Sequence, residues 1–186
     1  MSDHKKEITE QAASAYFVLS KIEKVQDRWN EITNELKEIT TLIQKEKEAA
    51  VLDFALAAIA IDVQTVRTHF KEKESDRIEK EVFRCLNIGA LGGYNINALA
   101  MYTAAFKHAE ETNNEDPLNA IANILIHDLL GTNITKFADP ETKIVSPFLI
   151  LTIAGLLTPF TGYWEKLNED YTLIKGKEES LAKNDN

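Results

Sequence analysis

One run of the sequence, residues 144 to 164, constrains the fold more than any other feature. It carries no charged residue between Lys143 and Glu165. Its apolar side chains must therefore leave water, either in the interior of the protein or in a membrane. We expect the interior. Insertion at a membrane interface in response to a trigger, and a full membrane span, are the alternatives.

Prolines divide this run into two predicted helices. Each of the 4 prolines follows a residue that favours the N-cap position: Asp116, Asp139, Ser146 or Thr158. Proline fits the first turn of a helix, where its missing N–H has no intrahelical partner. We therefore predict one helix over about 147–157 and a second from residue 159 onward. The first would be about 16 Å long against about 30 Å of hydrocarbon in a bilayer, so it does not span alone.

The first part of the chain has a regular apolar pattern. Its spacing alternates between three and four residues, as in a heptad repeat, and predicts one amphipathic helix from about residue 7 to 48, roughly 60 Å long. On such a helix these apolar residues form one line, which we call the seam, and we treat part of the seam as a candidate interaction surface. Complementary Glu/Lys pairs do not flank it, which favours packing within the same chain over a dimer. The seam comprises Ala15, Val18, Ile22, Val25, Trp29, Ile32, Leu36, Ile39 and Ile43, with Ile22 to Ile39 as the candidate surface.

The remaining sequence predicts further helices and no strand. Residues 49–70 carry two apolar stripes, typical of a central helix with neighbours on both sides. A helix after a cap at Ser75 or Asp76 should end at the glycines of 89–93, and others should cover about 95–112 and 117–131. The prediction is an all-α bundle of about six to eight helices. We divide it into an arm (1–48), a core (49–176) and a frayed polar tail (177–186).

Composition excludes some partners and suggests a compartment. The net charge of −9 argues against general binding to nucleic acid, because phosphate recognition needs a basic face. Cys85 is the single cysteine, so no disulfide forms within the chain and a reducing compartment fits best. The first residues lack the apolar core of a secretion signal. We expect a cytoplasmic protein.

Two aspartates stand in the most apolar segment, Asp53 and Asp62. A buried carboxylate needs a partner or a raised pKa, so we expect both side chains at an exposed edge of their helix. The alternative is a polar spot in an apolar cavity, where Asp62 and His69 share one helix face. For a ligand such as an acyl chain, Asp62, His69, Asn97 and Tyr102 are the candidate binding residues.

No motif predicts a catalytic residue, a cofactor or a metal. The histidines lack the Glu-x-x-His and HExxH spacings, and the glycines of 89–93 lack phosphate-loop spacing. We interpret these glycines as a helix stop, with Asn95 capping the next helix. His127 and Asp128 are adjacent, hence about 100° apart on a helix, and are better explained as polar residues near a helix end than as an acid/base pair.

The functional prediction is a non-enzymatic helical bundle that acts through protein contacts, in a regulatory or adaptor role. Its partner would be a second copy of the chain or another helical protein. A binding module for an apolar small molecule is the first alternative. A protein that becomes membrane-active through residues 147–164 is the second.

Overall fold

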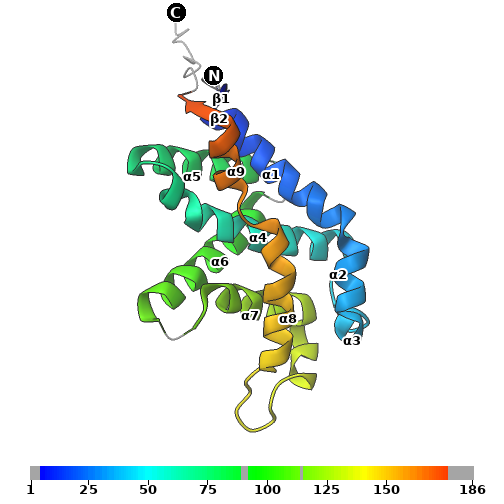
Figure 1. Ribbon diagram of the computed structural model, residues 1–186. Coiled ribbons are helices and arrows are strands. Elements are labelled where there is room, and N and C mark those ends of the chain that lie inside the picture. Colours follow the sequence, from blue (N-terminus) through cyan, green and yellow to red (C-terminus); the bar gives the residue numbers. More distant parts are fainter. Residues whose placement is uncertain (1–4, 89–91, 114, 176–186) are drawn as a thin grey trace, which may run out of the picture.

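The computed structural model describes residues 5–88, 92–113 and 115–175, and it is mostly helical (78%), as predicted (Figure 1). The helices pack together into a bundle, with a minor two-stranded parallel sheet. In chain order the elements are β1 (Lys6–Thr9), α1 (Glu10–Asp27), α2 (Trp29–Glu35), α3 (Lys37–Thr40), α4 (Lys47–His69), α5 (Glu72–Leu86), α6 (Gly92–Thr112), α7 (Pro117–Leu130), η1 (Gly131–Lys136), α8 (Pro147–Leu157), η2 (Thr158–Phe160), α9 (Tyr163–Asp170) and β2 (Tyr171–Ile174).

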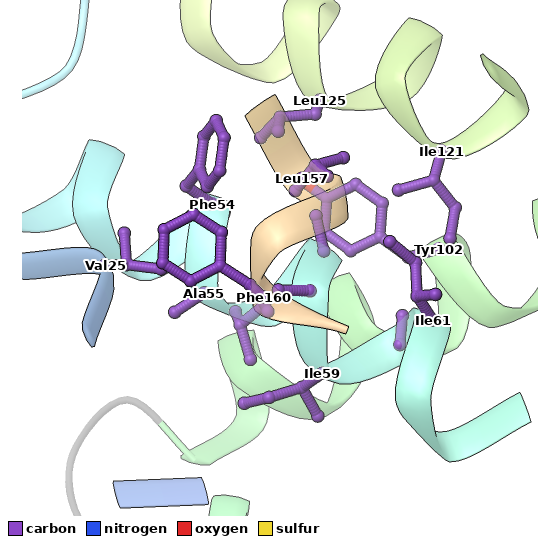
Figure 2. Packing of buried hydrophobic residues seen from close by; sticks show 14 of the residues in the cluster. Val25, Phe54, Ala55, Ile59, Ile61, Tyr102, Ile121, Leu125, Leu157 and Phe160 are labelled. Atoms are coloured by element: carbon purple, nitrogen blue, oxygen red, sulfur yellow. The ribbon is translucent and has the colours of Figure 1, made fainter. Parts of the chain in front are cut away.

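Helix α4 forms the centre of the core. Every residue from Asp53 to Val63 is buried, and α4 packs against α1, α5, α6, α7, α8 and α9. Its alanines let these neighbours approach closely, while Phe54 and Ile59 fill the space between them (Figure 2). The two apolar stripes of the sequence correspond to a helix that is covered on more than one side.

The N-terminal seam packs on the core from Val18 to Ile43, but the predicted single helix is wrong. The chain bends at Arg28 and at Leu36, whose ψ angles of 6° and 20° lie outside the helical range. Hydrogen bonds such as Ile32 N–H to the Arg28 carbonyl continue across the bends. A straight helix of roughly 60 Å would outreach a small domain, whose diameter is about 30 Å. Bending keeps the seam on the core (Figure 1).

A short parallel sheet joins the two ends of the described chain, although the sequence predicted no strand. β1 pairs with β2 in the register Lys6 to Tyr171 through Thr9 to Ile174. Each strand has only four residues, too few for alternation to stand out. The second helix predicted from residue 159 onward therefore ends at Asp170, where β2 follows.

The four prolines occupy three kinds of structure: Pro117 and Pro147 begin α-helices, Pro140 lies in a turn, and Pro159 lies in a 3-10 segment. The predicted helix over 147–157 is confirmed as α8. Asp116 caps α7 as expected, because its side chain accepts hydrogen bonds from two N–H groups of the first turn. Asp139 instead closes a turn by accepting from the N–H groups of Glu141 and Thr142. Thr158–Phe160 is a short 3-10 segment, and α9 begins only after Gly162, which has a φ of 82°.

Two other helix starts differ from the sequence predictions. α5 begins at Glu72, ahead of the predicted caps. α6 begins at Gly92, so Asn95 lies inside the helix and donates to the Leu86 carbonyl instead of capping. A Cβ at Gly92 would lie 2.5 Å from the Asn87 carbonyl oxygen, so only glycine fits this close approach. Residues 89–91 of the predicted glycine stop, and the tail 177–186, lie outside the described residues.

Candidate functional site

Asp62 forms a buried ion pair with Lys21 in the core. Its carboxylate lies 2.6 Å from the Lys21 Nζ, and the two side chains are 1% and 3% exposed. The N–H groups of Gly162 and Tyr163 also donate to Asp62, at 2.8 and 3.2 Å. Lys21 donates in addition to the Phe160 carbonyl. One carboxylate thereby ties α1 and α4 to the turn before α9.

This arrangement corrects the prediction that Asp62 lies at an exposed edge. Burial lowers the pKa of Lys21 and outweighs the opposing effect of Asp62. A charge removed from water is tolerated here because the carboxylate has an ionic partner and backbone donors. The sequence pattern missed this pairing because Lys21 lies on the inner side of α1, among apolar neighbours.

Asp53 is also fully buried, but its partners reach the surface. Lys45 and the Tyr94 hydroxyl both donate to its carboxylate, and Lys45 lies 3.0 Å from the Tyr94 hydroxyl. Burial, together with the hydrogen bond to Asp53, raises the pKa of Tyr94. Burial alone would lower the pKa of Lys45, but the hydrogen bonds to Asp53 and Tyr94 prevail and raise it. Asp53 therefore does not lie at an exposed edge either.

The four predicted ligand residues do not come together around one cavity. Asp62 is occupied by Lys21, and the Tyr102 hydroxyl donates to Asp128 at 2.8 Å. Asn97 is exposed on α6, and His69 is half-buried near the end of α4. Burial, with Asp128 nearby, raises the pKa of Tyr102. Asp128 thus serves a hydrogen bond between α6 and α7, while its neighbour His127 is exposed.

These polar contacts hold helices together and show no sign of an activated group. Burial raises the pKa of the Cys85 thiol, which disfavours the nucleophilic thiolate. Within residues 5–88, 92–113 and 115–175, His, Cys, Asp and Glu side chains form no group of three that would hold a metal ion.

The uncharged run shows the largest departure from expectation, because much of it lies on the surface. Phe148 is 78% exposed, Leu151 is 58% exposed and the preceding Ile144 is 61% exposed. In α8 only Ile153, Ala154 and Leu157 are buried. Within α8, the interior position predicted for this run holds for one side alone, while Val145, Phe160 and Trp164 of the same run are buried outside α8. We call its outer side, Phe148, Leu151, Gly155 and Thr158, the α8 face.

A hollow of about 290 Å³ borders the α8 face. Its walls come from α2, α3, the segment before α8, and α8 itself. Its lining includes the apolar residues Leu36, Ile39 and Phe137 and the charged residues Glu35, Lys37 and Glu38. The α8 face therefore adjoins a depression whose lining is both apolar and charged.

Two stretches are long and apolar enough for a membrane span by length and composition only. Lys47–His69 is 78% buried, as befits a core helix, whereas Pro147–Asp170 is only 28% buried. The second stretch is interrupted at Thr158–Phe160 and Gly162. Core helices of soluble proteins pass the same test, so this is weak evidence for a membrane role.

The predicted interaction seam lies inside the chain in this structure. Val25, Trp29, Ile32, Leu36 and Ile39 are between 0% and 6% exposed, and Ile22 is half-buried. These side chains contribute to the core and offer no outer surface.

The α8 face was missed as an outer surface because α8 is apolar all round, a pattern typical of buried helices. The exposed positions 148, 151, 155 and 158 do have the spacing of one helix face, and that spacing was the available signal.

Comparisons with protein-family models, curated proteins and solved structures find no match to this chain.

Proposed function

We propose that this protein is a non-enzymatic helical bundle that binds another protein through the α8 face. The single observation that carries the proposal is the exposure of Phe148 and Leu151 on a helix without any charge. Monomeric proteins seldom leave a large contiguous apolar patch in water, and those that do often use it for binding. A regulatory or adaptor role in the cytoplasm fits this activity.

The chemistry of the surface supports a partner with an apolar helix face. Burying apolar surface contributes about 25 cal/mol per Å², and aromatic side chains such as Phe148 dominate the energetics of interfaces. α8 is a regular helix, and its inner residues Ile153, Ala154 and Leu157 anchor it to the core. A rigid helix loses little conformational entropy on binding, which favours association.

A photoreactive phenylalanine analogue at position 148 tests this proposal. In cells that naturally produce the protein, benzoylphenylalanine replaces Phe148. In a matched control chain it replaces Tyr16 instead. Tyr16 is an aromatic residue with 65% exposure on α1, outside the α8 face. We expect position 148 to give a protein adduct of discrete mass that position 16 does not give. The partner protein captured at position 148, once purified by itself, must also bind the intact chain.

Other results would contradict the proposal. Equal adducts from positions 148 and 16, or none from 148, would remove the evidence for a protein site. Adducts to lipid alone would favour the membrane-active alternative. An adduct of small mass would favour the apolar-ligand alternative, for which the hollow beside α8 is close to the lower size of known ligand pockets, about 300 Å³.

A further inference from the structure

The α8 face has the spacing of a helix that pairs with another helix. Phe148, Leu151, Gly155 and Thr158 follow one another at intervals of three, four and three residues. These are the spacings of the contact positions in paired helices. Thr158 lies beyond the end of α8 but keeps helical dihedrals, φ −51° and ψ −45°, so its side chain continues the same face.

The order of large and small residues along this face is self-complementary. The two large residues, Phe148 and Leu151, come first, and the small residues Gly155 and Thr158 follow. If two copies run antiparallel about the level of Ile153, Leu151 faces Gly155 and Phe148 faces Thr158. Each large side chain then meets a small one. A parallel pair would instead place Phe148 on Phe148 and leave glycine facing glycine.

Space and charge agree with this pairing. A Cβ at Gly155 would meet no atom within 4 Å, so the position is open to a side chain from outside. α8 itself carries no charged residue, so no like charges meet where two α8 faces touch. Elsewhere, copies with a net charge of −9 repel one another.

We infer that the partner of the α8 face is a second copy of this chain, paired antiparallel about a two-fold axis near Ile153. The inference rests on the proposed function and names its partner. Such an isologous interface is self-complementary, because the contact from Leu151 to Gly155 occurs twice. The largest exposed apolar patch of a typical monomeric protein measures about 300–600 Å², below the roughly 800 Å² per partner of a standard interface. The dimer therefore exchanges with monomer.

Disulfide trapping tests the pairing and its direction. Chains with Leu151→Cys and chains with Gly155→Cys, both also carrying Cys85→Ala, are mixed in a glutathione redox buffer. Facing positions on helices 8–10 Å apart come within disulfide reach. We expect the mixed disulfide to exceed the Tyr16→Cys self-disulfide at least about tenfold, because pairing raises the effective concentration.

The same experiment discriminates between the two directions. In the antiparallel pair, the two copies of residue 155 are offset by about 6 Å along the axis, which puts their Cα atoms beyond disulfide reach. Gly155→Cys alone should then link no better than the Tyr16→Cys control. Self-linking of Gly155→Cys as efficient as the mixed reaction would overturn the antiparallel arrangement.

Sedimentation velocity of the intact chain provides the second readout. The average mass should rise with concentration from the 21.0 kDa monomer towards twice that value. Gly155→Trp should remain monomeric, because an indole there blocks Leu151 of the other copy. A wild-type chain that stays monomeric throughout overturns the self-pairing. If the wild-type chain is monomeric but benzoylphenylalanine at position 148 still gives an adduct to a different protein, the proposed function survives without the self-pairing. If it gives no adduct, the proposed function and the self-pairing both fail.

Discussion

Helices α4 and α8 are both rich in apolar residues, yet they use that surface in opposite ways. α4 is buried continuously from Asp53 to Val63, and it holds two charged side chains in the interior. α8 has no charge, and only Ile153, Ala154 and Leu157 are buried. Apolar composition therefore does not by itself locate the core. In α4 apolar surface holds the fold together, whereas in α8 half of it remains available for contact.

The largest expected effect contrasts two phenylalanines. Phe54 on α4 is 0% exposed and Phe148 on α8 is 78% exposed. Phe54→Ala should lower the free energy of unfolding by about 3–5 kcal/mol, because it leaves a cavity. Phe148→Ala should change it by less than about 0.5 kcal/mol, as exposed substitutions do. Urea unfolding of the two variants measures both values, and similar losses would contradict the contrast.

The second prediction separates the two aspartates of α4. Asp62→Ala leaves Lys21 buried without its carboxylate, and should cost about 3–5 kcal/mol in the free energy of unfolding. Asp53→Ala should cost less, about 1–3 kcal/mol, because the Lys45 side chain is 27% exposed and can be hydrated. Chemical denaturation of both variants at pH 7 provides the comparison. Equal losses would mean that solvent access to the partner does not matter.

The third prediction concerns alkaline pH and the interior around α4. Folding raises the pKa of Tyr102, so above its ordinary value near 10 the unfolded chain loses a proton that the folded chain keeps. The free energy of unfolding should fall above pH 10, by up to about 1.4 kcal/mol per pH unit for each such tyrosine. The lowered pKa of Lys21 has the opposite effect. It makes the free energy of unfolding rise as the pH approaches 10.5, and above pH 10.5 it adds no further increase.

Urea unfolding at pH 8, 10 and 11 measures this dependence. The raised pKa values of Tyr94 and Lys45 contribute in the same direction as that of Tyr102. Tyr102→Phe serves as the control and should flatten the decline above pH 10. A decline of the same slope in that variant would show that Tyr102 is not its source.

The smallest expected effect is a gain in stability on α8. Gly155→Ala should raise the free energy of unfolding by about 0.5–1 kcal/mol, because alanine loses less backbone entropy in a helix and meets no neighbour there. Gly92→Ala should instead destabilise, since its Cβ would lie 2.5 Å from the Asn87 carbonyl oxygen. Thermal unfolding monitored by circular dichroism distinguishes a gain from a loss. A destabilising Gly155→Ala would contradict the open space around this position within the chain.

Local patterns predicted the fold class and several elements well. The two stripes of residues 49–70 identified the central helix, and Ser146–Pro147 located the start of α8. Sequence reasoning missed what depends on distant partners. The strands pair residues about 165 positions apart along the chain, and Lys21 reaches Asp62 from another helix. An apolar helix also gives no internal sign of which side its neighbours cover, so the α8 face required the structure.

The most direct test of the α8 face combines the photoreactive residue at position 148 with the substitution Leu151→Asp. Leu151 is 58% exposed, so the charge should leave the free energy of unfolding within about 0.5 kcal/mol of the parent. A charge at the centre of an apolar contact should abolish the protein adduct. An unchanged adduct yield, or a chain that unfolds because Leu151 belongs to the core, would contradict the account.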